Sequence, residues 1–433
     1  MDYKVYTLHN YRNLPQIDQL TEAQKFAIDV VGRVLPFKTN NYVTNELIDW
    51  NHFEDDPIFN LNFPSKEMLK ARHFNKMADI INLGASREQV RQLANQIRAQ
   101  LNPHPAGQLR HNVPEFKGER LSGIQHKYRE TVLFFPNQGQ TCHAYCTFCF
   151  RWPQFTGMKE LKFGMKQADL LTAYIKAHPE VSDLLFTGGD PLIMNATTLG
   201  TYINALLETP LPHLQNIRMG TKALSFWPYR FLTDKDADEL IRLFEKIIQS
   251  GRHLTIMAHF SHPRELQTQA VKDAIQRIRN TGAQIRTQSP VLNHINAHPN
   301  IWADMWKEQV KLGMVPYYMF VPRETGAQQY FALPLIKLYH IFREAYQQVS
   351  GIARTVRGPS MSAHPGKIQI LGTSMIYGEK VFVLRFIQGR DPEWVLKPFF
   401  ARYNPYAMWI DDLKPAFGES AFFYEKDSYP HYV

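Results

Sequence analysis

Short apolar segments alternate with longer segments of helical spacing through the middle of the chain. In each longer segment apolar residues recur at intervals of three and four, and the short segments have the composition of buried strands. Six strand-then-helix units follow, with strands expected at 132–135, 183–186, 216–219, 253–260, 283–289 and 315–321. The helices are expected at 166–178, 197–208, 236–250, 264–281, 300–312 and 331–350. Because a closed barrel of this kind needs eight units, the pattern predicts an α/β fold with a curved, partly open (β/α)6 barrel, similar to part of a TIM barrel.

The segments on either side of this pattern are organised differently. Before it the chain combines helices with irregular structure, and after it the helical spacing stops and strands are expected. The sequence therefore predicts three regions. They are a helical and irregular N-terminal region at 1–123, the barrel at 124–367, and a strand-containing segment at 368–433 that covers the open barrel or mediates self-association.

Local patterns predict the elements of these flanking regions. In the N-terminal region helices are expected at Glu22–Val34 and Lys66–Ile81, and a third begins at the capping-box residues Ser86 and Gln89. The stretch Asn40–Pro64 is rich in Asn, Asp, Phe and Pro, so we expect an extended loop that packs through its aromatic rings. Near the C-terminus strands are expected at Lys367–Leu371 and Lys380–Ile387.

All three cysteines of the chain lie within eight positions, as Cys142, Cys146 and Cys149. Thiolates are the usual ligands of iron–sulfur clusters, and a four-iron cluster normally takes four of them. With three available, one iron is left open to a ligand from outside the protein. The alternatives are three unrelated buried thiols, a disulfide with an odd thiol, and a zinc site completed by His143 or His126. The C-x3-C-x2-C spacing favours the cluster with an open iron, which is a reaction site.

Composition and charge narrow the class of protein. The 433 residues are 44% hydrophobic and 21% charged, as in ordinary globular proteins, and no run of about 18 apolar residues predicts a membrane span. The first residues lack the apolar core of a signal peptide, so we expect a protein of the reducing cytoplasm. The net charge of +9 is spread along the chain, which favours anionic cofactors and small acidic substrates over nucleic acid.

Chemically suggestive residues follow each expected strand. In parallel α/β sheets such residues gather at the carboxyl ends of the strands, where ligands bind. In strand order they are the cysteine loop, Thr187-Gly188-Gly189-Asp190, Gly220-Thr221-Lys222, His259 with Ser261-His262-Pro263, Gln288, and Arg323-Glu324. We therefore expect them to line one mouth of the barrel.

These motifs resemble a known family. C-x3-C-x2-C after the first strand of a partial barrel is similar to the signature of radical S-adenosylmethionine enzymes, and Phe186–Leu192 resembles their Gly-Gly-Glu-type segment. Over roughly residues 15–372 the chain resembles the lysine 2,3-aminomutase-like group of that superfamily. The matching segments are His259–Pro263 (family His-Phe-Asn-His-Pro), Gly220–Lys222 (Gly-Thr-Arg), Gln288–Leu292 (Gln-Thr-Val-Leu-Leu), Pro316–Phe320 (Pro-Tyr-Tyr-Leu-Tyr) and Pro365–Ile368 (a Gly-rich segment with the cofactor lysine).

The resemblance implies three cofactors, namely a [4Fe-4S] cluster on the three cysteines, S-adenosylmethionine and pyridoxal 5'-phosphate. Lys367 stands at the position of the lysine that forms the Schiff base with pyridoxal phosphate. Lys127 and Tyr128 stand where the family has the Arg-Tyr that holds the phosphate, whereas Thr131 replaces a later arginine. The implied S-adenosylmethionine site consists of Gly188, Gly189, Asp190, Thr221, His259 and Gln288.

The substrate implied by the resemblance is an amino acid whose α-amino group moves to the β-carbon. Arg151 matches the family arginine that pairs with the substrate carboxylate, and a guanidinium fork suits that group. Two aspartates receive the distal ammonium in the lysine enzyme; the first aligns with Arg323 and the second, after a gap, with Arg357. Replacing acids by arginines would repel lysine and attract a glutamate-like or aspartate-like side chain, unless Arg323 pairs with Glu324 or points outward.

The sequence therefore predicts a radical, pyridoxal-dependent 2,3-aminomutase for an amino acid other than lysine. The alternative is a radical enzyme that acts on another small molecule or on a protein lysine, with or without pyridoxal phosphate. A non-catalytic redox or iron sensor is the third possibility, but it would have no need of the Gly-Gly-Asp, His259 or Lys367 motifs. We also expect a reductant of flavodoxin or ferredoxin type, a homo-oligomer, and neither nucleic-acid nor membrane partners.

Overall fold

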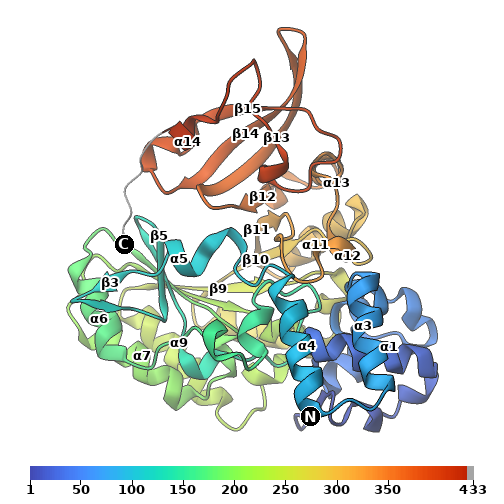
Figure 1. The fold of residues 1–433 in the computed structure, drawn as a ribbon. Helices are drawn as coiled ribbons and strands as arrows, with labels where there is room; N and C mark the ends of the chain where they lie inside the picture. The colour runs from blue at the N-terminus through green and yellow to red at the C-terminus, as the bar shows by residue number, and fades with distance from the viewer. Residues whose placement is uncertain (427–433) are drawn as a thin grey trace.

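The computed structural model describes residues 1–426, and its main feature is one continuous sheet of eleven strands (Figure 1). In spatial order the strands are β5 (Ile124–Tyr128), β6 (Thr131–Phe134), β7 (Asp183–Phe186), β8 (Asn216–Thr221), β9 (His253–His259), β10 (Gln284–Pro290), β11 (Val315–Phe320), β12 (Arg357–Ser362), β13 (Gly366–Ile376), β14 (Glu379–Gly389) and β15 (Pro398–Arg402). Strands β6 to β12 pair in parallel. The outer pairs, β5–β6 and β12 to β15, are antiparallel.

One helix or more follows each strand from β6 to β11, and Figure 1 shows these helices around the outside of the sheet. The long ones are α6 (Ala168–Ala177), α7 (Ala196–Glu208), α9 (Ala237–Gln249), α10 (Gln269–Asn280), α11 (Pro299–Lys311) and α13 (Leu335–Gln347). The shorter ones are α8 (Ala223–Phe226) and α12 (Gln328–Phe331). The expected α/β fold with a partial (β/α)6 barrel is thus confirmed, and β12 adds a seventh parallel strand that the apolar pattern did not predict.

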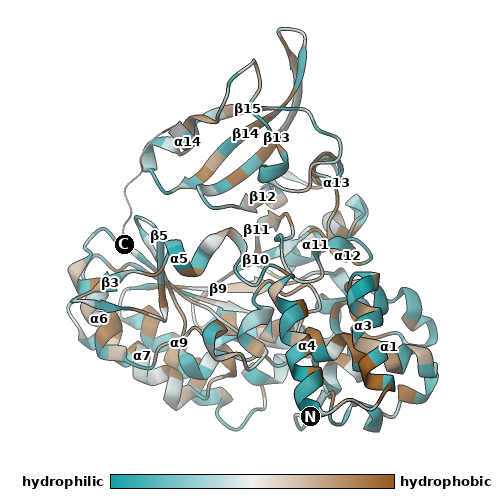
Figure 2. Ribbon diagram, viewed as in Figure 1, coloured by the Kyte–Doolittle hydropathy of each residue, from teal (hydrophilic) through white to brown (hydrophobic). Residues whose placement is uncertain are grey.

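Local chemistry explains why the helices begin where they do. Asn195 caps α7 by accepting a 2.7 Å hydrogen bond from the Thr198 amide, and Thr268 caps α10 in the same way. The strands are short and apolar because both faces of the parallel sheet are covered. Figure 2 shows the brown, hydrophobic residues concentrated on the strands and on the helix faces that pack against them. Rings of Phe134 and Phe186, on adjacent strands, meet at 5.3 Å in the core.

The N-terminal region forms a small helical layer beside the barrel. Helices α1 (Glu22–Val34), α3 (Ala71–Asn82) and α4 (Arg87–Ala99) pack on one another. Capping boxes at Thr21 and Ser86 start α1 and α4, the second as expected from the sequence. Its other strands and helices are β1 (Val5–Thr7), β2 (Lys38–Asn40), α2 (Pro57–Asn62), α5 (Gln108–His111), β3 (Glu115–Phe116) and β4 (Glu119–Arg120).

Two expectations for this region were wrong. The helix expected at Lys66–Ile81 begins at Ala71, because Leu69 and Lys70 have extended backbone that separates it from a 3-10 turn at Lys66–Met68. The stretch Asn40–Pro64 is a series of short helical turns, with Asp49 and Asp56 as caps, and does not form an extended loop. Its aromatic rings do pack together, for example Phe59 on Phe63 at 4.6 Å.

The C-terminal strands continue the barrel sheet. Strands β13 and β14 contain both stretches in which strands were expected, and α14 (Phe423–Lys426) packs its rings on them. The expected boundary between residues 367 and 368 falls inside β13, so the division into regions at that point does not coincide with a break in the fold. Figure 1 shows these strands standing over the barrel mouth, which places Lys367 of β13 and Gln388 of β14 against the interior.

Among residues 1–426 the structure contains no helix with the length and apolar character needed to cross a membrane.

Candidate active site

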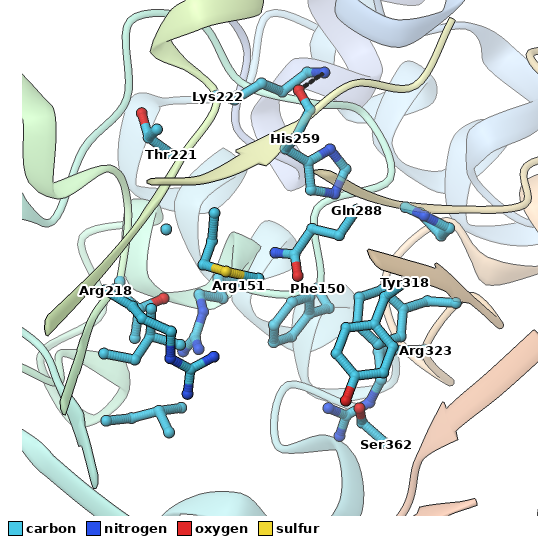
Figure 3. A pocket seen from close by; sticks show the side chains of 18 of the residues that line it. Phe150, Arg151, Arg218, Thr221, Lys222, His259, Gln288, Tyr318, Arg323 and Ser362 are labelled. Atoms are coloured by element: carbon cyan, nitrogen blue, oxygen red, sulfur yellow. Dashed lines mark hydrogen bonds between the residues drawn. The ribbon is translucent and has the colours of Figure 1, made fainter. Parts of the chain in front are cut away.

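The barrel encloses a cavity of about 600 Å³ that the N-terminal region, the strand ends and the C-terminal strands all help to line (Figure 3). Fourteen of the fifteen residues expected at the site line it. They are Lys127, Tyr128, Cys142, Cys146, Cys149, Arg151, Gly188, Gly189, Asp190, Thr221, His259, Gln288, Arg323 and Lys367. The structure therefore brings together residues that are up to 240 positions apart in the sequence. Arg357 is the exception.

The three cysteine side chains are partly buried and face this cavity from the loop after β6. Burial raises the pKa of the Cys149 thiol to about 11 and raises the pKa of Cys142 and Cys146 as well. Free thiolates are therefore disfavoured here, and the thiols gain from a metal that deprotonates them on binding. Burial in one cavity with no disulfide is the state that an iron–sulfur cluster requires.

The geometry is not that of a single-metal site. Within residues 1–426 no three His, Cys, Asp or Glu side chains converge closely enough to bind one ion. Each thiolate of a four-iron cluster binds a different iron, so three cysteines around a cluster need not converge. His126, considered above as a zinc ligand, has its Nδ1 2.7 Å from the Tyr174 hydroxyl. Neither His126 nor His143 is among the residues that line the cavity.

The Gly-Gly-Asp segment packs directly on the cysteine loop. Gly188 has φ of +130°, and a Cβ on Gly189 would lie 2.4 Å from both the amide nitrogen and the carbonyl oxygen of Thr141. The Asp190 amide donates to the Thr141 carbonyl at 2.7 Å. The Asp190 carboxylate accepts from the Thr221 hydroxyl at 2.8 Å and from the Lys222 amide at 2.9 Å. Asp190 therefore ties the ends of β7 and β8 to the cysteine loop.

His259 and Gln288 are neighbours across the parallel strands β9 and β10, and both reach the cavity. The His259 ring stacks on Phe148 of the cysteine loop, with centroids 5.8 Å apart. Its Nδ1 is buried without a hydrogen-bond partner in the described chain, and burial lowers the pKa of the ring well below its usual value. A neutral imidazole with an unused nitrogen suits a polar ligand between the barrel and the cluster loop.

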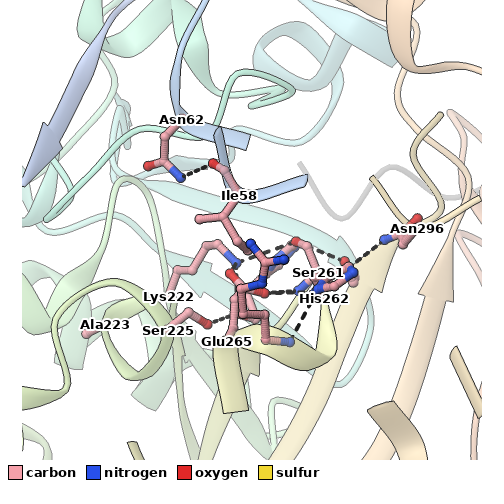
Figure 4. A network of polar contacts seen from close by, with 12 residues as sticks. Ile58, Asn62, Lys222, Ala223, Ser225, Ser261, His262, Glu265 and Asn296 are labelled. Carbon is pink, nitrogen blue, oxygen red and sulfur yellow. Dashed lines mark hydrogen bonds and ion pairs between the residues drawn. The ribbon is translucent and has the colours of Figure 1, made fainter. Parts of the chain in front are cut away.

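A buried polar network holds the end of β9 (Figure 4). Lys222 pairs with Glu265 at 2.6 Å, and Glu265 is fully buried. Lys222 also donates to the His259 carbonyl at 3.2 Å, as does the Ser225 hydroxyl at 2.6 Å. The other Glu265 oxygen accepts from the Ser261 amide. The His-Phe-Ser-His-Pro segment is therefore held by the side chains of Lys222, Ser225 and Glu265.

Two arginines lie on either side of one aromatic ring. The guanidinium of Arg151 lies 4.8 Å from the Phe150 ring centre, and that of Arg323 lies 5.3 Å from it. Nη1 of Arg151 is buried without a hydrogen-bond partner in the described chain. Burial lowers the pKa of Arg151 to about 10 and also lowers that of Arg323, yet both remain cationic at neutral pH. This pair presents positive charge beside the cysteine loop (Figure 3).

Arg323 both reaches the cavity and approaches Glu324, the two arrangements that the sequence left open. It lines the cavity, and its Nε lies 3.6 Å from a Glu324 oxygen, while its Nη2 donates to the Pro105 carbonyl at 3.1 Å. The contact with Glu324 is long for a hydrogen bond. Arg357, in contrast, is exposed at the start of β12 and stacks on Tyr317 at 4.7 Å, so the structure does not bring it to the cavity wall.

Lys367 approaches the cavity from β13. Its Nζ donates to the Gln388 side chain at 3.1 Å. Burial lowers the pKa of Lys367 to about 7, with Arg218 and Arg357 adding to the effect. Lys127 also lines the cavity, and its Nζ donates to the Ala363 carbonyl. Burial, then the nearby charges of Arg390, Arg323 and Lys367, lowers the pKa of Lys127 well below its usual value.

The structure adds cavity residues that the sequence did not single out. Arg218 of β8 pairs with Asp183 of β7, and Asp183 also accepts a 3.0 Å hydrogen bond from Thr131. Phe150 and Gln388 line the wall beside the arginines and Lys367. Arg218 could have been predicted as a cavity residue from the sequence. It lies two residues before Gly220 on the same strand, and alternate residues of a barrel strand point inward.

Comparison with known proteins identifies the family. No family model matches the chain. A protein of Aquifex aeolicus named "Putative L-lysine 2,3-aminomutase" is 31% identical over 400 residues, covering 92% of this chain and 93% of that protein. The chain belongs to the lysine 2,3-aminomutase-like family of radical S-adenosylmethionine enzymes. Such enzymes bind a [4Fe-4S] cluster and S-adenosylmethionine and act on a substrate alongside them.

More distant matches cover less of each protein. The L-lysine 2,3-aminomutase of Bacillus subtilis is 30% identical over 234 residues, which is 54% of this chain and 46% of that enzyme. Among solved structures, Streptococcus suis SuiB covers 78% of this chain and 66% of its own, with 11% identity and a TM-score of 0.38. A score at that level supports no argument, so the family assignment rests on the sequence relatives and the fold on the structure itself.

Proposed function

We propose that this radical S-adenosylmethionine enzyme is a pyridoxal-dependent 2,3-aminomutase whose substrate is an amino acid with an acidic side chain. One observation supports the acidic substrate above others. The two carboxylates that line the cavity, Asp183 and Asp190, are both bound within the protein, whereas Arg151 has a guanidinium nitrogen without a partner. Within residues 1–426 the cavity therefore offers cations but no unused anion.

The cysteine loop and the strand ends suit the first two cofactors. The thiols of Cys142, Cys146 and Cys149 would hold the cluster, and the crowded Gly188-Gly189 turn would leave its backbone facing the adjacent ligand. His259 and Gln288 would contribute polar groups on the opposite wall. When bound, the cluster and S-adenosylmethionine would supply the radical chemistry that removes a hydrogen atom from a substrate. The side chains named here would bind and orient the two cofactors.

The wall near Lys367 suits pyridoxal phosphate, which stabilises an unpaired electron on the bound amino acid and lets its nitrogen move. The amine of Lys367, with a pKa near 7, is available as a nucleophile at neutral pH. Lys127 and Tyr128 also line the cavity, and the positive charges of Arg323 and Arg390 near Lys127 favour a phosphate. The Thr131 hydroxyl donates a hydrogen bond to Asp183, so it does not take over phosphate binding from the arginine that the family has at this position.

The two arginines around Phe150 suit a substrate with two carboxylates. Arg151 would pair with the α-carboxylate, and Arg323 would meet the side-chain carboxylate across the Phe150 ring. A lysine substrate would bring a third cation to the same place without a carboxylate to neutralise it, which is unfavourable in a buried site. Arg357 is left out of this role because of its exposed position.

The test is an anaerobic incubation of the full chain, reconstituted with iron, sulfide and pyridoxal phosphate, with S-adenosylmethionine and dithionite. L-Glutamate should give its β-amino isomer, which chromatography separates before mass spectrometry. L-Aspartate returns the same molecule when its nitrogen moves, so [1-13C]aspartate should give the [4-13C] compound. Formation of β-lysine from L-lysine, without any glutamate or aspartate product, would overturn the proposal. The same incubation without S-adenosylmethionine is the control.

We expect a flavodoxin or ferredoxin type of reductant, a cytoplasmic location and self-association, as the sequence predicted. Reduction by a purified flavodoxin system in place of dithionite and the mass of the native particle in solution would check the first and the last of these.

A further inference from the structure

Strand β2 (Lys38–Asn40) of the N-terminal region runs along the cysteine loop. The Tyr145 amide donates to the Lys38 carbonyl at 2.8 Å, so a backbone hydrogen bond joins the two segments. The Lys38 side chain then turns to the first cysteine, and its Nζ lies 2.5 Å from the Cys142 carbonyl oxygen and 3.4 Å from the Thr141 hydroxyl. The N-terminal region thus places a cation at the start of the cluster loop.

The charge on Lys38 is not neutralised by a carboxylate. In the part of the chain that the structure describes, Lys38 forms no ion pair, and its nitrogen lies 5.6 Å from the Tyr145 ring centre. Lys222, which is also close to the cysteines, differs because Glu265 lies 2.6 Å from it. Arg151 would be neutralised by the carboxylate of a bound substrate. Lys38 is therefore a cation beside the loop that no carboxylate of the described chain neutralises; burial lowers its pKa, and the adjacent Cys142 side chain opposes that shift.

A positive charge beside an iron–sulfur cluster has a predictable effect. Reduction adds one negative charge to the cluster, and a nearby cation in a poorly solvated site stabilises the reduced form more than the oxidised one. We propose that Lys38 is a positioning residue that raises the reduction potential of the cluster at Cys142, Cys146 and Cys149, which favours transfer of an electron from the external reductant to the cluster. This inference rests on the cluster assigned under the proposed function.

The competing explanation is that Lys38 only ties the loop to the N-terminal region. The chain offers a matched control for that explanation, because Tyr3 also bonds the loop, with its hydroxyl donating to the His143 carbonyl at 2.7 Å. Tyr3→Phe removes a contact between the same region and the same loop without changing charge. Lys38→Met removes both contact and charge, and Lys38→Arg keeps the charge.

The experiment is an anaerobic redox titration of the reconstituted full chain, followed by electron paramagnetic resonance of the reduced cluster, with iron content measured for every variant. In Lys38→Met we expect the equilibrium constant for one-electron reduction to fall about tenfold, a shift of about 59 mV to more negative potential. Lys38→Arg and Tyr3→Phe should stay close to the wild type. The iron content separates a lost cluster from a shifted potential.

Each outcome decides the role of Lys38. A wild-type potential in Lys38→Met with full iron content would overturn it, as would equal shifts in Lys38→Met and Tyr3→Phe, which would show a purely structural role. If Lys38→Met loses its iron, Lys38→Gln and Lys38→Arg at full occupancy replace it, and equal potentials in those two would overturn the role too. The absence of any cluster signal in the wild type would overturn the proposed function with it.

Discussion

The side-chain nitrogen of Lys367 lies 4.2 Å from the centre of the Tyr318 ring, between the last strand of the barrel repeat and the strands that cover it. Contact with an aromatic face favours a cation, yet burial outweighs it and lowers the pKa of Lys367 to about 7. An exposed lysine, with a pKa near 10.4, has a neutral amine in only about one molecule in 2,500 at pH 7. The wall that holds Lys367 therefore makes it a nucleophile.

The first prediction concerns the pH dependence of this lysine. Below its pKa the amine is protonated and unreactive, and above it the amine is neutral, so capture of pyridoxal phosphate by Lys367 should rise with pH and level off above about 7. Borohydride reduction at each pH, followed by peptide mass analysis, measures the labelled fraction. Lys380, exposed on the adjacent strand, is the internal control. A labelling midpoint near that of free lysine would contradict the prediction.

The second prediction compares Arg323 and Arg357, which the sequence assigned to the same role, contact with the substrate side chain. Arg323→Leu should raise the KM for an acidic substrate by about 10- to 100-fold, because a hydrogen bond to a charged group contributes roughly 1.5–3 kcal/mol. Arg357→Leu should change KM less than about threefold, since Arg357 is exposed and outside the cavity wall. Steady-state kinetics with the substrate identified above measures both. Equal effects of the two substitutions would contradict the placement of the acidic side chain at Arg323.

These residues also show how far sequence alone could reach. The helix Glu22–Val34 and the strand Asp183–Phe186 were predicted with the bounds that the structure has, because a capping box and an apolar run mark their ends locally. Strand β12 was missed, since Arg-Gly-Pro-Ser-Met-Ser has neither alternation nor an apolar run and pairs only because β11 and β13 lie on either side. Arg357 lies in that strand, where the alignment needed a gap.

The contacts that set the chemistry of the site were harder to predict than its residues. Lys38 and Cys142 are separated by 104 positions, and no local pattern links a lysine of a short strand to a loop so far along the chain. The same holds for the low pKa of Lys367, which depends on burial under strands whose position the sequence left open. The sequence motifs predicted which side chains reach the cavity. The hydrogen-bond partners and the burial of those side chains depend on the fold and could not be predicted in the same way.

The third prediction concerns the contact between the Gly-Gly-Asp segment and the cysteine loop. A Cβ at Gly189 would lie 2.4 Å from backbone atoms of Thr141, next to Cys142, so Gly189→Ala must displace the loop. We expect iron occupancy below half of the wild type and S-adenosylmethionine binding weaker by at least about tenfold, since displacement of cluster and ligand groups lowers affinity. Iron analysis and equilibrium dialysis measure these quantities.

Gly200→Ala is the matched control for this substitution. Gly200 lies inside α7, and the nearest atom to an added Cβ is Asn204 Nδ2 at 3.9 Å, which is ordinary contact distance. This variant should keep full iron and ligand binding and gain about 0.5–1 kcal/mol in stability from the helix-favouring alanine. Normal iron and ligand binding in Gly189→Ala would show that the loop accommodates a methyl group and would contradict the third prediction.

The fourth prediction concerns the buried pair between Lys222 and Glu265. Glu265→Gln leaves the Lys222 charge buried without its partner, and breaking one side of such a pair typically costs about 3–5 kcal/mol. Since Lys222 also bonds the His259 carbonyl, S-adenosylmethionine binding should weaken together with stability. Urea unfolding followed by circular dichroism measures the first effect. Glu22→Gln, which removes an exposed carboxylate that pairs with Lys25 and Arg12, should change the unfolding midpoint far less.

A double substitution separates charge from packing at the same place. Lys222→Met with Glu265→Leu removes both charges and keeps apolar volume, so the part of the lost stability that comes from the unpaired Lys222 charge should return, while the Ser261 and His262 amides stay without their Glu265 acceptor. S-adenosylmethionine binding should not return, because the methionine side chain cannot donate a hydrogen bond to the His259 carbonyl. Recovery of both properties would mean that Lys222 only fills space, whereas recovery of stability alone assigns it the support of the β9 end. Unfolding and ligand binding therefore report two separate roles of one ion pair.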